Sequence, residues 1–293
     1  MMKVILEEKI NMINQYLDKF VGVSQQYQET IFEAMRYSLF AGGKRLRPIL
    51  MIGAYEAFDG KDIEQIMPFA CGMEMIHTYS LIHDDLPAMD NDDYRRGKLT
   101  NHKVFGEGMA VLAGDALLNT AFEVMIGGCM GNELIGIKAM KVIAQAAGVN
   151  GMIGGQVVDL ESEHKQISPE ILDYIHENKT AKLIQASLQA GAIVAQADEA
   201  KINLMKKAGY RLGVAFQIQD DILDVIGDIK ELGKPIKSDI KNEKSTFVNM
   251  YGLEKSKQIV KKYSKEACDI FETLGKKGEF LNQLSQHLID RRV

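Results

Sequence analysis

The stretch Ser80–Gly97, SLIHDDLPAMDNDDYRRG, places five aspartates and two arginines directly after apolar helical sequence. A second acidic stretch, Phe216–Asp224, reads FQIQDDILD and also interrupts apolar helical sequence. Carboxylates in such surroundings repel one another and are costly to desolvate unless cations neutralise them. Magnesium suits this role because it takes a few carboxylates and leaves coordination positions for phosphate oxygens. Since guanidinium groups bind phosphate oxygens two at a time, the pattern indicates a magnesium–diphosphate site.

Apolar residues recur at helical spacing along most of the chain. Series with intervals of three or four positions start at Ile63, Leu112 and Leu183. Convincing alternating strand patterns and hairpin dipeptides are absent from the sequence, and no clear repeat or linker divides it. The sequence therefore predicts one all-α domain over residues 1–293, with many helices around a central space.

Composition narrows the class of protein. Apolar residues make up 46% of the chain and charged residues 26%, which is ordinary for a soluble globular protein. The formal net charge of −5 argues against a nucleic-acid-binding surface. The three cysteines are widely spaced and suggest neither a disulfide framework nor a zinc site. The first ten residues lack the pattern of a signal peptide, and charges break apolar stretches such as 110–118, so we expect a cytoplasmic protein without integral membrane association.

Helix geometry groups the carboxylates further. Asp220 and Asp224 are four positions apart and Asp221 and Asp224 three, so these side chains can share one flank of a helix. Asp90 lies beyond a proline and must fold back from the helix end to join Asp84. A single acidic segment is usually a solvated helix end. Two such clusters beside an arginine pair instead favour two helix-borne carboxylate groups that clamp a metal–diphosphate cluster across a cavity.

The order of these motifs resembles that of the trans-isoprenyl diphosphate synthases, and most closely the bacterial-type farnesyl diphosphate synthases. The matching blocks are Gly42–Pro48, His77–Gly97, Gly154-Gly155-Gln156 with Asp159, Lys179-Thr180, Phe216–Asp224 and Gly233-Lys234. They span nearly the whole chain, and their joint specificity is far higher than that of any single block.

The resemblance implies an isoprenoid-synthase-type helical bundle around a central cavity, usually as a homodimer. It implies magnesium-dependent, head-to-tail condensation of isopentenyl diphosphate with dimethylallyl or geranyl diphosphate, with Mn²⁺ as a substitute metal. The allylic diphosphate would ionise, and the alkene of isopentenyl diphosphate would attack the cation to give farnesyl diphosphate. Metals and cationic side chains absorb the charge of the departing diphosphate, which is a plausible base for the final proton.

The same resemblance assigns roles to individual residues. The expected metal ligands are Asp84, Asp90 and Asp220, with Asp85, Asp221 and Asp224 as support or as ligands through water. The residues expected to act in catalysis are Asp84, Asp85, Asp90, Lys179, Thr180, Gln217 and Asp220. Thr180 and Gln217 would offer oxygen dipoles to the allylic cation.

Substrate-binding residues follow in the same way. The allylic diphosphate is expected at Arg95, Lys179 and Lys234, with Lys244 as a weaker candidate. Isopentenyl diphosphate is expected, without a metal, at Lys44, Arg47, His77 and Arg96, where Gly42 and Gly43 permit close approach of the backbone. Phe216 is a further expected substrate contact beside Gln217. Gln156 and Asp159 are expected to hold lysine or arginine side chains in place.

Product length depends on the helix before Asp84. If the diphosphate is fixed there, side chains four and five positions earlier meet the growing tail roughly 6–7.5 Å below the metal. These are Ser80 and Tyr79. A tyrosine would form a partial floor, while a serine leaves room for a ten-carbon primer. In the family that the chain resembles, this pair, together with Pro87 and Ala88 between the aspartates, indicates a fifteen-carbon product.

Four other functions remain open on the sequence alone. A geranylgeranyl diphosphate synthase shares every catalytic motif and is the closest alternative. A class I terpene cyclase has a different second metal motif and no use for Lys44 and Arg47. A metal-binding helical bundle without prenyl transfer would need Glu-x-x-His pairs, and only Glu74 with His77 matches. A catalytically silent partner subunit would typically lack intact aspartate clusters.

Overall fold

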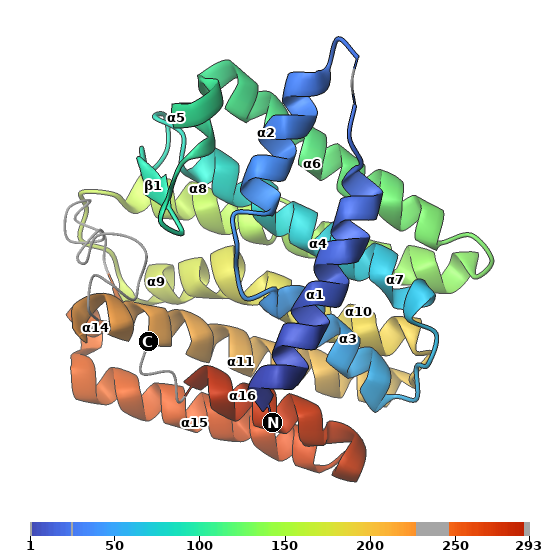
Figure 1. The fold of residues 1–293 in the computed structure, drawn as a ribbon. Coiled ribbons are helices and arrows are strands. Elements are labelled where there is room, and N and C mark those ends of the chain that lie inside the picture. Colours follow the sequence, from blue (N-terminus) through green and yellow to red (C-terminus); the bar gives the residue numbers. More distant parts are fainter. Residues whose placement is uncertain (1, 25, 227–245, 290–293) are drawn as a thin grey trace. The chain divides into compact units, whose positions relative to one another are not determined.

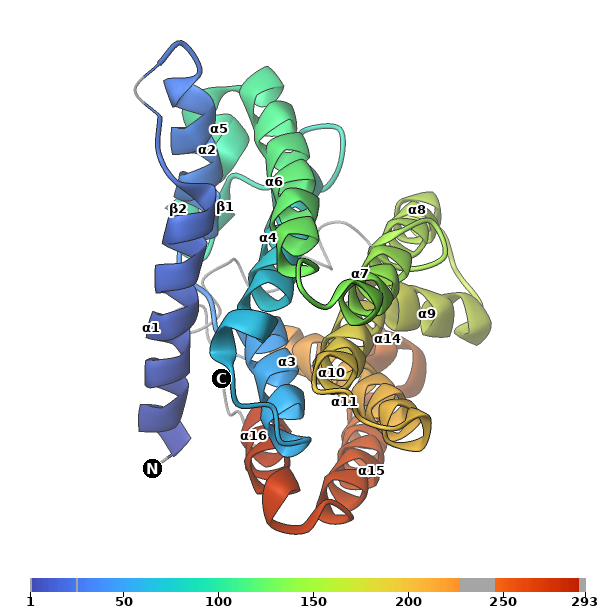
Figure 2. The same ribbon diagram turned by 90° about the vertical axis from the view of Figure 1, so that its right-hand side faces the viewer.

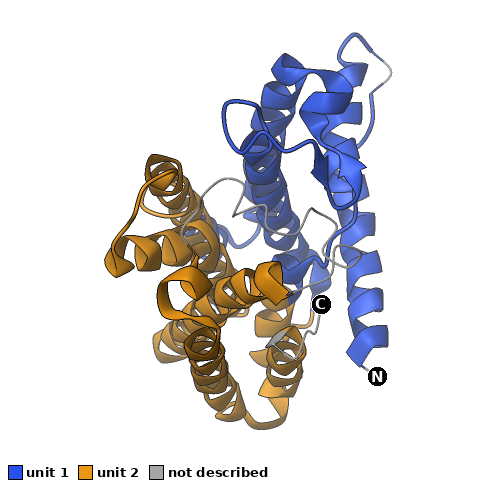
Figure 3. Cartoon of the chain, turned by 90° about the vertical axis from the view of Figure 1, so that its left-hand side faces the viewer, with its two compact units in different colours: residues 1–49, 62–140 blue, residues 50–61, 141–293 orange. Residues whose placement is uncertain are grey.

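The structure is a computed structural model that describes residues 2–24, 26–226 and 246–289 (Figure 1). The chain divides into two compact units, residues 1–49 with 62–140 and residues 50–61 with 141–293 (Figure 3). Helices α3 (Leu46–Ala57) and α7 (Glu133–Ala147) contribute residues to both. Almost all the regular structure is helical, which confirms the predicted all-α class. The single domain expected from the sequence stays a prediction.

The first unit is built around two long helices that pack on each other, α4 (Ile63–Asp84) and α6 (Glu107–Gly128). Its further elements are α1 (Met2–Val21), α2 (Glu29–Leu39), β1 (Tyr94–Arg95), β2 (Lys98–Leu99) and α5 (Asn101–Phe105). The side chain of Asp62 caps α4 by accepting a hydrogen bond of 3.1 Å from the amide of Glu64. Helices α4 and α6 lie side by side and form the main packing contact of this unit (Figures 1 and 2).

Small residues allow α4 and α6 to approach closely. A Cβ added at Gly72 of α4 would lie 2.7 Å from Met125 Cγ, and one added at Gly128 would lie 2.5 Å from Pro68 Cβ. Ala113 and Ala121 are also buried on α6. Because these positions carry little or no side chain, the two helices share a close contact over most of their length.

Helix α6 is the one helix in the described part of the chain that is long and apolar enough to cross a membrane by length and composition alone. The charge of Asp115, within the apolar stretch 110–118, argues against a membrane-spanning segment. Its most apolar 18-residue segment is 33% buried in the structure, and its buried residues belong to the packing contact with α4. A core helix of a soluble protein passes the same test.

The sequence did not reveal the antiparallel hairpin β1–β2. Tyr94 pairs with Leu99 and Arg95 with Lys98, and the two-residue turn consists of Arg96 and Gly97. Both turn residues have positive φ, 52° and 74°, as a type I′ turn requires. Strands of two residues are too short to show alternation, so the pattern search could not find them.

The second unit consists of helices packed around α11. Its further elements are α8 (Met152–Ser162), α9 (Pro169–Ile175), η1 (His176–Ala181, a π-helix), α10 (Lys182–Val194), α11 (Glu199–Ile226), α14 (Phe247–Tyr251), α15 (Leu253–Glu272), η2 (Gly275–Gly278, a 3₁₀-helix) and α16 (Glu279–Ile289). Helix α11 packs most extensively on α10 and α15. At Gly213 an added Cβ would lie 2.6 Å from the Cα of Ala181, so this glycine brings α11 against η1.

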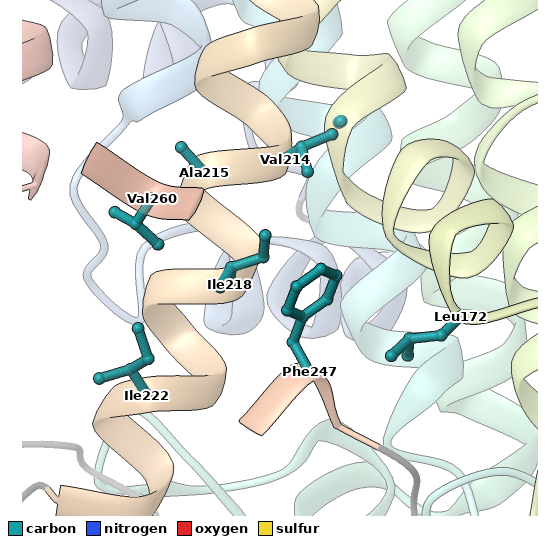
Figure 4. Close-up of a cluster of buried hydrophobic side chains, with 8 residues drawn as sticks. Leu172, Val214, Ala215, Ile218, Ile222, Phe247 and Val260 are labelled. Atoms are coloured by element: carbon teal, nitrogen blue, oxygen red, sulfur yellow. The ribbon is translucent and has the colours of Figure 1, made fainter. Parts of the chain in front are cut away.

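A cluster of buried apolar side chains fixes the acidic end of α11. Ile218 and Ile222 of α11 pack in this cluster with Phe247 of α14 and Leu172 of α9 (Figure 4). The ring of Phe247 also stacks on His176 at a centroid distance of 5.7 Å. The cluster therefore joins the segment after residue 245 to the helix that carries the second aspartate motif.

Candidate active site

The first aspartate motif closes into a tight loop at the end of α4. The helix ends at Asp84, and Asp85 is its C-terminal cap. The amide of Asp90 then donates a hydrogen bond of 2.9 Å to the carbonyl oxygen of Asp84. Asp84 and Asp90 are both half-buried. The chain therefore folds back as expected and joins these two residues through their backbones.

Asp85 contacts an arginine of the same motif. Its carboxylate accepts hydrogen bonds of 2.7 and 2.8 Å from Arg95 Nε, and Arg95 Nη2 lies 2.6 Å from Oδ1. Burial raises the pKa of Asp85 to about 6, while the guanidinium opposes that rise. Because both oxygens bind Arg95, the carboxylate orients this guanidinium. The expectation that Asp85 supports the site fits this arrangement better than direct metal binding.

Arg96 lies against the glycine pair of the loop before α3. Its Nη1 donates a hydrogen bond to the carbonyl oxygen of Gly42. A Cβ added at Gly43 would lie 2.6 Å from Arg96 Nη1, and Gly43 has a φ of 116° that favours glycine. The structure thus brings Gly43 and Arg96 together, two of the residues expected to bind isopentenyl diphosphate.

His77 lies among arginines. Burial lowers the pKa of His77 well below its ordinary value of 6.5, and the positive charges of nearby arginines lower it further. The arginines that contribute are Arg47, Arg96, Arg95 and Arg45. Lys44 is exposed and Arg47 half-buried in the same unit. A neutral histidine surrounded by cations provides both a hydrogen-bond donor and a positive potential for an anion.

Arg45 has a role that the sequence did not reveal. Its side chain is only 2% exposed and forms a 2.9 Å ion pair with Glu74, whose side chain is equally buried. It also donates hydrogen bonds of 2.9 Å to Asn14 Oδ1 and 2.6 Å to the carbonyl oxygen of Leu39. The backbone of Arg45 is left-handed, with φ of 47°. Arg45 therefore holds the end of the loop that carries Lys44, directly before α3 and its residue Arg47.

The pairing of Glu74 with Arg45 also bears on the metal-bundle alternative. Glu74 would have to be a metal ligand with His77, but its Oε1 contacts Arg45. Within the described ranges, no three His, Cys, Asp or Glu side chains gather closely enough to hold a metal by themselves. A magnesium ion that takes part of its ligands from a diphosphate needs no such cluster.

Lys179 lies in the π-helix η1. Its Nζ forms a 2.7 Å ion pair with Asp159 of α8, as expected for a carboxylate that holds a lysine in place. A Cβ at Gly155 would lie 2.7 Å from the Cα of Lys179, so this glycine lets α8 contact the backbone of η1. π-Helical turns are rare in proteins overall, but those that occur are often found at functional sites.

A chain of hydrogen bonds connects Thr180 to the second aspartate motif. The Thr180 hydroxyl donates a hydrogen bond of 2.6 Å to Gln217 Oε1. Gln217 Nε2 in turn donates a hydrogen bond of 3.0 Å to Asp221 Oδ1. The second oxygen of Asp221 accepts a hydrogen bond of 2.8 Å from the amide of Phe247 and lies 3.5 Å from His176 Nε2. Asp221 is 4% exposed. Its carboxylate thus fixes the orientation of the Gln217 amide.

The other residues of this motif differ in their burial. Asp220 and Phe216 are half-buried, and Asp224 is buried. Both carboxylate oxygens of Asp85 and both of Asp221 accept hydrogen bonds from other protein groups. The predicted residues Lys234 and Lys244, and the motif glycine Gly233, lie outside the described residues.

The predicted product-length residues, Tyr79 and Ser80, lie in α4 five and four positions before its last residue, Asp84. Ser80 donates a hydrogen bond of 2.8 Å to the carbonyl oxygen of His77. Tyr79 is buried, and its ring meets the ring of His83 edge-on at 5.7 Å. His77, Ser80 and Asp84 are all half-buried, and their spacing in α4 places them on one helix face.

Known proteins resemble this chain over nearly its full length. It is 42% identical to a farnesyl diphosphate synthase of Micrococcus luteus over 291 residues, which cover 98% of this chain and 99% of the relative. It is 45% identical to a farnesyl diphosphate synthase of Bacillus subtilis over 87% of both chains. It is also 46% identical to the large subunit 1 of a heterodimeric geranylgeranyl pyrophosphate synthase from Arabidopsis thaliana, over 89% of this chain and 71% of that protein.

Solved structures show the same similarity. An FPP/GFPP synthase from Zymomonas mobilis superposes with a TM-score of 0.88 at 32% identity, over 98% of both chains. A geranyltransferase from Helicobacter pylori, complexed with magnesium and isoprenyl diphosphate, gives 0.82 at 30% identity, over 97% of this chain and 96% of that one. Residues 28–279 match the sequence model of the polyprenyl synthetase family. By sequence and by fold, the chain belongs to the polyprenyl synthetase family.

Proposed function

We propose that this protein is a prenyltransferase that condenses isopentenyl diphosphate head-to-tail with dimethylallyl or geranyl diphosphate to give farnesyl diphosphate. The observation that carries this proposal is the loop that joins Asp90 to Asp84, in the same motif as the Arg95 guanidinium bound by Asp85. Carboxylates for a hard cation and guanidinium groups for phosphate oxygens thus come from a single segment, Asp84–Arg96.

The residues that would hold magnesium are Asp84, Asp90 and Asp220, each of which is half-buried and belongs to one of the two aspartate motifs. When bound, the metal neutralises charge on the departing diphosphate. Arg95 and Lys179 would bind the same diphosphate. Each is already held by a carboxylate, Asp85 or Asp159, so little reorganisation is needed when substrate arrives.

Isopentenyl diphosphate would bind without a metal in the first unit. Lys44, Arg47 and Arg96 supply positive charge, and the cationic surroundings keep His77 neutral. The absence of a side chain at Gly43 leaves the Arg96 guanidinium room beside the loop. Because these cationic side chains would bind the diphosphate directly, this site needs no metal ion. It therefore needs no carboxylates to hold one, unlike the site at the aspartate motifs.

The allylic cation would be stabilised from the second unit. Thr180 donates its hydroxyl hydrogen to Gln217, so its oxygen lone pairs remain available to a positive charge. Asp221 holds the Gln217 amide from the other side. Oriented oxygen dipoles of this kind stabilise a developing charge without becoming alkylated.

The protein would act as a cytoplasmic homodimer. Support for the dimer comes from apolar side chains exposed on the first unit: Leu112 is 55% exposed, Ile126 56% and Leu134 68%. Apolar surface on neighbouring elements of this kind favours a protein–protein contact. Sedimentation at micromolar concentration tests the dimer, and a monomer would contradict it.

We further propose that residues 1–293 act as a single domain, since each compact unit carries one aspartate motif. We also propose that Mn²⁺ can replace Mg²⁺.

Geranylgeranyl diphosphate is the second candidate product, because curated geranylgeranyl synthases are similarly related to the chain. The buried Tyr79 favours the shorter product. The test is incubation with labelled isopentenyl diphosphate and geranyl diphosphate, with magnesium or with EDTA. We expect farnesyl product only with the metal. Predominant twenty-carbon product would favour the alternative, and no transfer would contradict both. Within the farnesyl assignment, Tyr79→Ala should lengthen the product and Ser80→Phe should shorten it to ten carbons.

A further inference from the structure

Three residues that were not predicted as site residues, His83, Val111 and Gly114, connect Tyr79 to helix α6. The ring of Tyr79 meets the ring of His83, one helical turn later on α4, at a centroid distance of 5.7 Å and an angle of 80°. His83 Nε2 in turn donates a hydrogen bond of 3.0 Å to the carbonyl oxygen of Val111 on α6. The histidine thus connects Tyr79 to the neighbouring helix.

Gly114 of α6 determines where the histidine ring can lie. A Cβ at this position would collide with the imidazole, with 2.8 Å to Cε1 and still less to the other ring atoms nearby. Gly114 is buried. The missing side chain leaves a notch in α6, and the ring of His83 fills it. The notch and the hydrogen bond to Val111 together hold the ring against α6, where Asp115 Oδ1 also lies 3.9 Å from His83 Nε2.

Packing, and not a hydrogen bond, orients Tyr79. Its hydroxyl oxygen is buried and finds no hydrogen-bond partner among the described residues, and its side chain is 5% exposed. A tyrosine without such a bond keeps its ring orientation only through the groups that touch it. The edge-on contact with His83 is the aromatic contact that the structure records for this ring.

We propose that His83, seated in the notch at Gly114, is a positioning residue that determines product length through Tyr79. The proposal rests on the proposed function and extends it to two residues that are not among the expected substrate contacts. Tyr79 lies five positions before Asp84, roughly 7.5 Å along the helix, where it would stop the growing chain. With the histidine ring in place Tyr79 is fixed, and without it the ring can turn aside and admit a further five-carbon unit.

Two substitutions test this from opposite helices. His83→Ala removes the ring that contacts Tyr79, and Gly114→Ala fills the notch and displaces that ring. The matched control is Gly108→Ala on the same helix α6, where an added Cβ meets nothing within 4 Å. The measurement is the ratio of twenty- to fifteen-carbon product after dephosphorylation and chromatography. We expect about a tenfold rise for both test variants and an unchanged ratio for the control.

The double variant His83→Ala/Gly114→Ala should show no larger rise than either single variant, because both act on one contact. An unchanged ratio in both single variants would overturn the proposal, as would an equal rise in Gly108→Ala. If the parent protein transfers no prenyl group, the proposed function fails separately. A crystal structure of His83→Ala then still decides whether the Tyr79 ring moves, and an unmoved ring rejects the positioning role. The same crystal structure decides the case if a variant loses activity.

Discussion

The backbone amide of Asp90 donates a hydrogen bond of 2.9 Å to the carbonyl oxygen of Asp84, the last residue of α4. The bond closes a loop in which the amide of Asn91 also bonds to Leu86, at 3.1 Å. Asn91 adopts a left-handed φ of 52°, a conformation that asparagine tolerates. The loop therefore places the two carboxylates at one end of the helix, although six positions separate them in the sequence.

Asp90→Ala should lower kcat by at least about a hundredfold, because one partner in stabilising the diphosphate charge is lost. The matched control is Asp93→Ala, since Asp93 lies in the same acidic stretch but is exposed and pairs with Lys103 at 2.7 Å. We expect the control to stay within about twofold of the parent, as exposed ion pairs contribute little. Steady-state kinetics decides, and equal losses in both variants would contradict a specific role for Asp90.

Asp220 and Asp221 are neighbours with different predicted roles. Asp221→Asn should lower kcat by about tenfold, because the Gln217 amide loses its fixed orientation, a loss on the scale of one hydrogen bond. Its requirement for magnesium should stay as in the parent. Asp220→Asn should instead raise the magnesium concentration needed for half-maximal rate. Metal titrations of both variants separate the roles. A raised magnesium requirement in Asp221→Asn would show that this carboxylate is a ligand after all.

Removing Arg45 should destabilise the protein strongly. Arg45→Ala leaves Glu74 buried and unpaired, and breaking a buried pair in this way costs about 3–5 kcal/mol. Arg36→Ala is the control, because Arg36 also contacts a carbonyl oxygen and an aspartate but its side chain is 27% exposed and Asp18 61%. We expect a loss below about 1 kcal/mol there. Urea denaturation measures both, and equal losses would argue against the special role of the buried pair.

His77 should make the fold sensitive to acid. Burial and the nearby arginines hold the pKa of His77 below 6.5 in the folded protein, so the unfolded chain takes up the proton first as the pH falls. The contribution to stability is complete above pH 6.5 and is lost below it, by at most about 1.4 kcal/mol per pH unit. His77→Asn should show a shallower loss of stability between pH 6.5 and 5. Thermal denaturation across this range tests it, and parallel curves for both proteins would contradict the assignment.

The sequence predicted features that depend on local spacing, or on the motifs of the family that the chain resembles. The return of Asp90 to Asp84 and the support of Lys179 by Asp159 are confirmed. Each follows from local geometry, or from a motif in which the charge partners are few. The all-α class follows from apolar periodicity in the same way.

Other features depend on which of several similar side chains meet. The motif Gly42–Pro48 holds three cations, and nothing in its sequence shows that Arg45 turns inward to Glu74. Nor does a run of aspartates and arginines show that Asp85 selects Arg95. The π-helix η1 and the hairpin turn at Arg96 and Gly97 arise from tertiary packing and lack a strong local signal. The notch at Gly114 depends on contact between two helices, which periodicity cannot resolve.

In the proposed mechanism, the two aspartate motifs hold the metal that lets diphosphate depart from the allylic substrate. Its most direct test is the rate of farnesyl diphosphate formation by Asp84→Ala and, separately, by Asp220→Ala at saturating magnesium. We expect each rate to fall by about a thousandfold or more while circular dichroism stays that of the parent. Full-speed condensation by both variants would contradict the account.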